Sequence, residues 1–336
     1  MKVWLPAVRA GSGTDVFTER LATLIKSCGF AAEITWFPHH YELHPWDLRR
    51  FSPPQGTSLT WTNTWNGFAF HRQGIFHVTT EHHCVFDPLY RPYKNFAQHL
   101  YHLALIRRFE RLSFASADLV TAVSHFTANR LLALGALSEV RTIHNWIDTH
   151  RFTPSEVSAS PDAPFRLLFV GNLTRRKGGD LLIPIIDALG EGFELRVVGG
   201  LRVREDLSHP RIVPLNRLDE APLIAEYRSC NLLLCPSRYE GFGYAALEAM
   251  ACGRPVIASD NSALPEVVEQ GVTGILCQTD NIEGFVSAIR KFRDDPAMGQ
   301  RMGAAGRLRA QALFSEEARR QEMLALLEAV LEAKFQ

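Results

Sequence analysis

The stretch NLLLCPSRYEGFGYAALEAMACGRPVIASD, residues 231–260, decides the fold class. A short apolar run leads into a loop with two glycines, an alanine-rich helical pattern follows, and a second apolar run, PVIAS, ends it. This succession is typical of a βαβ unit in a parallel sheet. In such sheets ligands bind at the carboxyl ends of the strands, where a helix N-terminus offers N–H groups to an anion. The stretch therefore predicts an α/β fold with an anion-binding loop.

Two glutamates flank the glycines of this stretch. Glu240 stands on the loop, where its carboxylate can accept hydrogen bonds from ligand hydroxyls. Glu248 lies two turns into a helix whose other members are apolar, so we expect it to face solvent or a polar ligand, because burying an unpaired carboxylate is costly. A simpler interpretation stays open: Gly241 and Gly243 merely turn the chain, and Glu248 is solvated.

A second loop carries a cluster of cations. In LFVGNLTRRKGGD, residues 168–180, a strand ends at Gly171, and Arg175, Arg176 and Lys177 precede a helix that opens near Asp180. Three cations in a βα loop suit a diphosphate, because each forms charge-assisted hydrogen bonds with phosphate oxygens. The alternative is an ordinary solvated surface loop.

The chain predicts two domains. At about 150 residues per domain, 336 residues suffice for two cores, and TPSEVSASPDAP, residues 153–164, has the composition of a linker. Both sides alternate strand-like and helix-like runs. The expected strands are 2–7, 32–37, 58–61, 75–80, 119–123 and 140–144, then 165–170, 194–198, 231–235 and 255–259. The expected helices are 16–28, 96–114, 180–189, 223–229, 243–252 and 315–335.

Two loops of the first half also carry polar or glycine-rich patterns. RAGSGTD, residues 9–15, follows the first strand and resembles a fragment of a nucleotide-binding loop through Gly11 and Gly13. In TTEHHCVFD, residues 79–87, Glu81, His82 and His83 stand at a strand end and are expected to line the cleft between the domains. Their spacing is wrong for a helical zinc pair, which disfavours a metal there. An ordinary surface loop is the alternative.

Composition excludes several classes of protein. There are 36 basic and 36 acidic residues, so a dedicated nucleic-acid binder is disfavoured, and 46% apolar with 21% charged residues is typical of a globular chain. No apolar run is long enough to span a bilayer, and the N-terminal apolar stretch is too short for a secretory signal. The six cysteines form no CxxC pair and are interpreted as reduced thiols. We expect a cytoplasmic protein.

The helix expected over residues 96–114 suggests a further partner. Arg107, Arg108 and Arg111 share it with Leu100 and Leu103, and a basic, apolar face of this kind can contact the anionic inner leaflet of a membrane. The alternative is that the apolar residues of this helix are core and the arginines are solvated.

The run EGFGYAALE, residues 240–248, resembles the two-glutamate motif of the retaining family 4 glycosyltransferases, in which seven residues separate the acids, as here. The resemblance continues through residues 250–268, 170–179, 117–124 and 143–148. It implies a GT-B fold: two Rossmann-like domains with parallel sheets facing a central cleft, and a C-terminal helix crossing back to the first domain. The implied parts are an acceptor-side domain over 1–152, the linker, a nucleotide-sugar domain over 165–314 and the helix over 315–336.

The resemblance also implies an activity: transfer of a sugar from a nucleotide diphosphate, UDP- or GDP-linked, to a glycan or lipid-linked acceptor in polysaccharide or cell-envelope biosynthesis, with retention and with no cofactor or metal. The site residues that it implies are as follows: Glu240 for donor sugar hydroxyls, Glu248 for the ribose, backbone amides of Phe242, Gly243 and Tyr244 for the diphosphate, Lys177 to neutralise it, His82 near the transferred sugar, and Gly11 and Gly13 near phosphates and acceptor.

One departure from the family pattern concerns charge. Asn172 stands where the family usually has arginine, so Arg175 or Arg176 is expected to supply that charge. No Asp-X-Asp pair occurs at a strand end, so metal-bridged phosphate chemistry lacks its usual ligands. Two other functions remain open at this point: a nucleotide-sugar epimerase with the same architecture, and a non-catalytic subunit that keeps the fold.

Overall fold

The structure, a computed structural model, describes residues 1–11, 13–135, 137–155, 163–199 and 207–335, and the side chains of the last helix as far as residue 332. The chain divides into two compact units. The N-terminal unit comprises Met1–Trp146 and Glu316–Gln336, and the C-terminal unit comprises Ile147–Ser315. Most of the linker expected over 153–164 falls on residues 156–162, outside the described residues.

The N-terminal unit is built on a parallel six-stranded sheet in the order β2-β1-β3-β4-β5-β6. Its strands are β1 (Lys2–Val8), β2 (Ala31–Phe37), β3 (Thr57–Asn63), β4 (Phe76–Glu81), β5 (Leu119–Ala122) and β6 (Arg141–Thr142). Its helices are α1 (Gly13–Ser27), α2 (Phe96–Tyr101), α3 (Arg107–Ser116), α4 (His125–Ala133) and α11 (Glu316–Phe335). Short turns complete it: η1 (His39–Glu42), η2 (Pro45–Arg50), η3 (Gly67–Ala69), η4 (Arg91–Tyr93) and the π-helical η5 (His102–Ile106).

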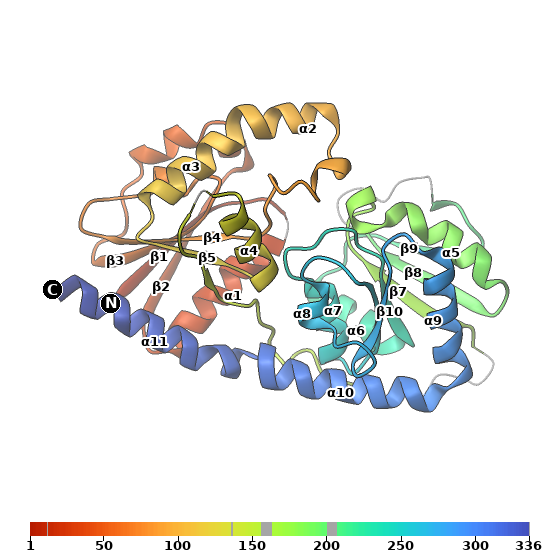
Figure 1. The fold of residues 1–336 in the computed structure, drawn as a ribbon. Helices are drawn as coiled ribbons and strands as arrows, with labels where there is room; N and C mark the ends of the chain where they lie inside the picture. Colours follow the sequence, from red (N-terminus) through yellow and green to blue (C-terminus); the bar gives the residue numbers. More distant parts are fainter. Residues whose placement is uncertain (12, 136, 156–162, 200–206, 336) are drawn as a thin grey trace. The chain divides into compact units, whose positions relative to one another are not determined.

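Helices cover both faces of this sheet: α3 lies over one face, and α1 with α11 over the other (Figure 1). The last helix is held by an apolar stripe at helical spacing, because Met323, Leu326, Leu327 and Val330 are all buried. A hydrogen bond from the Cys28 thiol to the carbonyl of Arg320 lies beside this contact. The final helix therefore belongs to the N-terminal unit although its sequence follows the C-terminal one.

The C-terminal unit has a second parallel six-stranded sheet, in the order β12-β11-β10-β7-β8-β9. Its strands are β7 (Phe165–Val170), β8 (Phe193–Val198), β9 (Ile212–Leu215), β10 (Leu232–Cys235), β11 (Val256–Ser259) and β12 (Gly274–Cys277). Its helices are α5 (Leu182–Leu189), α6 (Glu220–Ser229), α7 (Tyr244–Ala251), α8 (Leu264–Val267), α9 (Ile282–Asp294) and α10 (Pro296–Phe314), with the turns η6 (Arg175–Lys177) and η7 (Gly179–Leu181).

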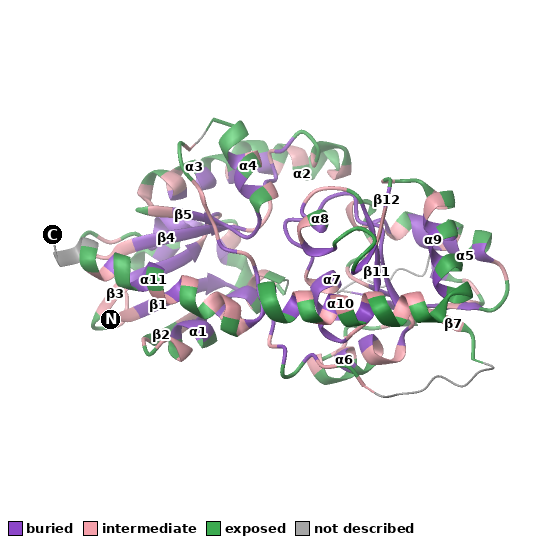
Figure 2. Ribbon diagram, turned by 60° about the horizontal axis from the view of Figure 1, so that its bottom comes forward, coloured by how far each residue is buried: buried purple, intermediate pink, exposed green. Residues whose placement is uncertain are grey.

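The strand order of the C-terminal sheet reverses between β7 and β10, which are neighbours although two strands separate them in sequence. Such a reversal leaves a crevice at the carboxyl ends of the two strands, where ligands of doubly wound folds bind. The strands themselves are largely buried (Figure 2). One apolar core forms between them and the packed helices α5 and α9, and includes Phe169, Ile185, Leu234, Phe285 and Ile289.

Several predicted boundaries differ from the observed ones. The N-terminal unit ends at Trp146 rather than at residue 152, because Arg307 of α10 donates hydrogen bonds to the carbonyls of Thr149 and Phe152 and ties them to the C-terminal unit. The helix predicted over 96–114 is continuous to Ser116 but contains a π-helical turn. Helix α6 begins before Pro222, because a proline in the first turn loses no hydrogen bond. No helix of the described residues is long and apolar enough to cross a membrane.

Candidate functional site

Two loops of the C-terminal unit meet at the reversal of strand order, one after β7 and one after β10. Their close approach depends on Gly178, which has a φ of 74° and whose hydrogen points at the second loop. A Cβ at this position would lie 2.2 Å from the carbonyl oxygen of Pro236. Only glycine meets both conditions, so this residue fixes the distance between the two loops.

The contact between these loops is an ion pair. The Nζ atom of Lys177 lies 2.5 Å from Oε1 of Glu240, and Nη1 of Arg176 lies 3.8 Å from Oε2 of the same carboxylate. The Arg176 guanidinium also donates a hydrogen bond to the carbonyl of Tyr239. Two cations therefore face one carboxylate, which leaves this point of the site with a net positive charge.

Glu240 is held ionised in a buried position. It is 6% exposed, and burial by itself would raise its pKa, but attraction to Lys177 and Arg176 outweighs burial and lowers the pKa below its ordinary value. Its backbone N–H donates a hydrogen bond to Oγ of Ser262. An ionised carboxylate accepts hydrogen bonds only, so it suits a ligand that presents hydroxyl donors.

Arg238 also joins these two loops, and sequence reasoning missed it. Its guanidinium donates two hydrogen bonds to Asp180, at 2.6 and 2.9 Å, and one to Asp280, at 2.5 Å. It also donates to the carbonyl of Arg175. The side chain is 5% exposed, so it acts as an internal clamp on the loops. The only signal in the sequence was its position two residues before Glu240.

The loop after β10 ends at the N-terminus of α7. Gly243 is the N-cap, with a φ of 109°, and as a glycine it has no side chain to cap this end. The first N–H groups of an α-helix have no partner within the helix, and the helix dipole adds partial positive charge there. Phe242 is buried, with its ring edge-on to those of Tyr244 and Phe314. These contacts hold Phe242 in place at the start of α7.

Glu248 is more buried than its sequence context suggested. It is 9% exposed, and its Oε2 accepts a 2.8 Å hydrogen bond from the hydroxyl of the fully buried Tyr227. Burial, followed by the nearby Glu248 carboxylate, raises the pKa of Tyr227 well above its ordinary value, so the phenol keeps its proton and donates it to this bond. The partner that allows this burial comes from α6, which the helical pattern around Glu248 does not reveal.

The remaining cation of the β7 loop has a different environment. Arg175 has a side chain 75% exposed, and its nearest carboxylate oxygen, on Asp180, is 3.9 Å away. Asn172 is exposed on the same loop, and its carbonyl accepts a hydrogen bond from the N–H of Thr174. Of the two arginines expected to replace the charge missing at Asn172, Arg176 is therefore the one that lies beside Glu240.

The N-terminal unit has a cavity of 260 Å³ at the carboxyl ends of its strands. The loops after β1, β2, β3 and β4 all line it, and the sheet order reverses there too, since β1 lies between β2 and β3. The lining residues are Val8, Ala10, Thr14, His39, Glu42, Asn63, Thr64, Trp65, Asn66, Glu81, His82 and His83. The predicted polar cluster of residues 81–83 therefore lines a cavity within this unit.

His82 is fixed in this cavity as a neutral ring. Its Nε2 lies 2.8 Å from Oδ1 of Asn63, and its ring is edge-on to Phe17 at 4.7 Å between centroids. Burial lowers the pKa of His82 to about 4. Because the amide oxygen of Asn63 accepts, the neutral ring donates from Nε2, which leaves Nδ1 as a hydrogen-bond acceptor.

Glu81 is a buried carboxyl group of the same cavity. It is 2% exposed, its Oε2 has no hydrogen-bond partner among the described residues, and burial raises its pKa to about 7. Its Oε1 accepts a hydrogen bond from the N–H of His83. Glu110 lies behind it, also buried and bonded to Trp65, and its pKa is raised well above the ordinary value by burial and by Glu81.

The glycine loop after β1 is closed by an acid. The N–H groups of Ala10 and Gly11 donate to the two oxygens of Asp15, at 3.0 and 2.9 Å. Gly11 has a φ of 65°, and Gly13 begins α1. The expectation that this loop lies near the acceptor side fits its place beside the cavity, since Ala10 lines it. The N–H group of Gly11, one of the two glycines predicted to lie near phosphates and acceptor, therefore donates to Asp15 in this structure.

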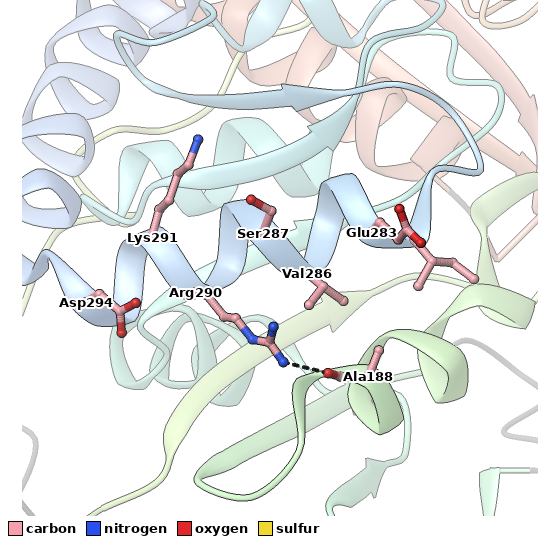
Figure 3. A pocket seen from close by; sticks show the side chains of 8 residues that line it. Ala188, Glu283, Val286, Ser287, Arg290, Lys291 and Asp294 are labelled. Carbon is pink, nitrogen blue, oxygen red and sulfur yellow. Dashed lines mark hydrogen bonds between the residues drawn. The ribbon is translucent and has the colours of Figure 1, made fainter.

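Another cavity of the C-terminal unit lies on the outer surface of α9 and shares no residue with the two loops (Figure 3). Arg290, Lys291, Glu283 and Asp294 line it, and Arg290 donates to the carbonyl of Ala188. It has two acids and two cations, so it offers a ligand no single electrostatic preference. Among the described residues, no group of three or more His, Cys, Asp or Glu side chains converges as a set of metal ligands.

Two family models match this chain. The model described as glycosyl transferases group 1 matches residues 151–309, and the model described as glycosyltransferase family 4 matches residues 57–151. The two matches adjoin at residue 151 and together cover both sets of loops described above, except for the loops after β1 and β2.

Curated relatives include three synthases or glycosyltransferases. A glycogen synthase of Mycobacterium tuberculosis is 33% identical, over 53% of this chain and 45% of the relative. A D-inositol 3-phosphate glycosyltransferase of Catenulispora acidiphila is 32% identical, over 56% and 52%. The chain thus spans about half the length of these two relatives. An alpha-maltose-1-phosphate synthase of Mycolicibacterium smegmatis is 28% identical, over 92% and 93%.

Solved structures are similar over nearly the whole chain. A sucrose-phosphate synthase of Thermosynechococcus elongatus has a TM-score of 0.84 at 21% identity, covering 99% of this chain and 100% of that one. Anabaena HepE in complex with UDP-glucose has a TM-score of 0.75 at 18% identity, covering 98% and 100%. At these identities the likeness shows the fold, and it confirms the predicted α/β class of the GT-B type.

Proposed function

This chain belongs to the group 1 glycosyltransferases of family 4, and on that premise we propose that it transfers a sugar from a nucleotide diphosphate sugar to a hydroxyl acceptor with retention of configuration. The observation that carries the proposal is the arrangement at the switch point of the C-terminal sheet. There Lys177 and Arg176 face the ionised carboxylate of Glu240, three residues before Gly243, the N-cap of α7. The site thus has cations that can bind phosphate oxygens next to a carboxylate that can bind sugar hydroxyls.

We assign the diphosphate to the cations and the helix N-terminus. Lys177 and Arg176 supply charge, and Arg176 replaces the cation that is missing at Asn172. The backbone amides of Phe242, Gly243 and Tyr244 supply hydrogen bonds to the phosphates. These groups stabilise the leaving diphosphate because its negative charge grows as the glycosidic bond breaks. With this charge met by side chains and amides, we propose that no metal or cofactor is required.

The donor's two sugars would meet the two glutamates. Glu240 accepts hydrogen bonds from hydroxyls of the transferred sugar, and Glu248 accepts them from the ribose of the nucleotide. Glu248 already accepts one from Tyr227, which orients its carboxylate. Since each carboxylate accepts from donors only, the pair selects polyhydroxyl groups at two fixed positions.

The acceptor would bind the cavity of the N-terminal unit. Its lining offers acceptor atoms, among them Oε2 of Glu81 and Nδ1 of the neutral His82 ring, which suit the hydroxyl groups of a glycan. We propose a glycan or a lipid-linked sugar as the acceptor, used in polysaccharide or cell-envelope assembly. His82 then contacts the hydroxyls of the transferred sugar or of the acceptor, and Gly11 and Gly13 shape the adjoining loop.

Retention would follow from attack on the same face that the diphosphate leaves. The acceptor oxygen forms a bond to the anomeric carbon, the bond to the phosphate oxygen breaks, and the hydroxyl proton passes to that phosphate oxygen. Glu240→Ala should then lose most turnover and accumulate no covalent glycosyl-enzyme. A sugar adduct trapped on any carboxylate of the protein would contradict this route.

Thermal unfolding with nucleotides tests the proposal directly. UDP, GDP and ADP are added separately, each with EDTA, to the wild type and to Glu248→Ala. A diphosphate at about 100 times its dissociation constant stabilises the folded protein by roughly 2.7 kcal/mol, which raises the melting temperature visibly. We expect one diphosphate to stabilise the wild type and not the variant. No shift with any of them would overturn donor binding.

Product analysis separates the transferase from the epimerase. The purified protein is incubated with the diphosphate sugar that stabilises it, with and without a glycan acceptor. Release of the nucleotide diphosphate only with acceptor supports transfer. A changed nucleotide sugar formed from the donor alone would instead establish an epimerase.

A further inference from the structure

One helical segment of the N-terminal unit exposes apolar side chains. It runs through α2, η5 and α3, and Phe96, Leu100 and Leu103 on it are 77%, 49% and 42% exposed. No other large apolar side chain of the described residues is as exposed as Phe96. The three recur at intervals of four and three residues, which places them along one side of a helix. Two other apolar residues of this segment, Ile106 and Phe109, are fully buried in the core.

The charges on the same segment are of one sign. Arg107, Arg108 and Arg111 are exposed. The only acid between residues 96 and 111 is Glu110, which is buried and accepts a hydrogen bond from Trp65. The exposed side of the segment therefore consists of apolar side chains at its start and arginines at its end. We call these six exposed residues, Phe96, Leu100, Leu103, Arg107, Arg108 and Arg111, the α2–α3 face.

A cavity adjoins the arginine end of this face. It has a volume of 430 Å³, and Arg107, Arg111 and the buried Glu110 line it together with apolar side chains such as Phe86 and Phe114. Its two arginines outnumber its one acid, which is buried, and they stand next to apolar side chains. The cavity thus combines arginines with apolar side chains, as the α2–α3 face does.

A lipid surface matches these features together. A helix that lies in a bilayer interface buries apolar side chains at the boundary with the acyl chains and places cations among the phosphates. Anionic headgroups attract each arginine, and no acid on the α2–α3 face opposes that attraction. A protein partner of high affinity would in addition need polar groups that pair individually with polar groups on this face. The α2–α3 face offers only arginines for such pairing.

We propose that the α2–α3 face docks the protein on an anionic lipid bilayer, with Phe96, Leu100 and Leu103 in the interface and the arginines on lipid phosphates. This docking does not depend on the proposed transferase activity, because none of the six residues lies in the loops assigned to donor or acceptor. It would bring the chain to lipid-bound molecules.

Vesicle flotation of the full chain tests the proposal. The vesicles contain phosphatidylcholine alone or phosphatidylcholine with phosphatidylglycerol, at low and at high salt. We expect binding to the mixed vesicles only, weakened by salt because counter-ions screen the arginines. Arg107→Gln should lower the partition coefficient about fivefold, the equivalent of roughly 1 kcal/mol for one cation near an anionic surface. Failure of the wild type to float with anionic vesicles at low salt would overturn the proposal.

A matched pair of variants assigns the binding to this face. Phe96→Ser removes the most exposed apolar side chain of the face, and Leu308→Ser removes one that is 66% exposed on α10 of the C-terminal unit. Both positions are exposed enough for the melting temperature to stay unchanged. We expect Phe96→Ser alone to reduce flotation. An equal loss in Leu308→Ser would overturn the assignment, and so would a wild-type dimer that Phe96→Ser converts to a monomer without vesicle binding in either.

Discussion

The Nζ atom of Lys177 lies 2.5 Å from Oε1 of Glu240, although the two residues are 63 positions apart in the chain. They meet because β7 and β10 are neighbours in the sheet, which brings the loops that follow them together. The pair holds Glu240 ionised at a buried position and leaves Arg176 beside it as a second cation. Several of the expected results below depend on this contact.

Removing the cation of this pair should impair donor binding and turnover. In Lys177→Ala, Glu240 keeps only Arg176 at 3.8 Å, so its pKa should rise and the site should lose half of its positive charge. We expect turnover to fall about 100-fold or more, as when one group that stabilises transition-state charge is removed. Arg175→Ala is the matched control, because it removes an exposed cation from the same loop. Equal losses in the two variants would show that only overall charge matters.

A methyl group at residue 178 should separate the two loops. Gly178→Ala places a Cβ 2.2 Å from the carbonyl oxygen of Pro236, and its φ of 74° adds strain of about 1–2 kcal/mol. Gly29→Ala is the matched control, since Gly29 has a φ of 88° just after the end of α1 and open space around the Cβ. We expect a larger loss of unfolding free energy, and loss of nucleotide binding, in Gly178→Ala only. Equal unfolding energies by urea titration would contradict the close approach.

The hydrogen bond between Tyr227 and Glu248 should contribute to stability. Tyr227→Phe leaves the buried carboxylate without this donor, which should reduce the free energy of unfolding by about 1–3 kcal/mol. Nucleotide diphosphates should bind more weakly, because the carboxylate is no longer oriented. Phe152→Leu, another substitution of a buried ring in this unit, serves as a control for packing. If Tyr227→Phe leaves both quantities unchanged, the bond has no such role.

The buried acid of the N-terminal cavity should make stability depend on pH. The pKa of Glu81 is about 7 in the folded protein, and its ordinary value is 4.5. The contribution of Glu81 to the free energy of unfolding is therefore fully present below pH 4.5 and is lost as the pH rises to about 7. Glu81→Gln should therefore gain unfolding free energy relative to the wild type across this window, by at most ~3 kcal/mol. Urea titrations at a series of pH values measure the difference.

Two details make this measurement specific. Burial lowers the pKa values of His77 and His82 to about 4. Their contribution to the free energy of unfolding therefore changes in the opposite direction and is lost as the pH falls from 6.5 towards 4. Their contribution is common to both proteins and cancels in the difference. Glu139→Gln, at an exposed position of the same unit, should show no pH-dependent gain. A flat difference for Glu81→Gln would mean that Glu81 is not held protonated.

Local patterns in the sequence were sufficient for the fold class and for the loops of the site. The strand, loop and helix around Glu240 and the cationic loop around Lys177 each occupy one short stretch, and the structure places both where the βαβ pattern puts a ligand loop. The order of the strands and helices could be predicted because hydrophobic periodicity and glycine positions are signals contained in a few neighbouring residues. The final helix could also be predicted, from its stripe of apolar residues.

The sequence by itself thus determined the parallel α/β class, the family and the loops that carry charge. Only the tertiary structure decided that Lys177 contacts Glu240, that Arg238 clamps Asp180, and that Tyr227 is the partner of Glu248. It also decided which side of residues 96–111 is core and which is exposed. The physical reason is that each of these facts depends on which strands and helices become neighbours. That choice is made by packing between distant segments, and no local pattern contains it.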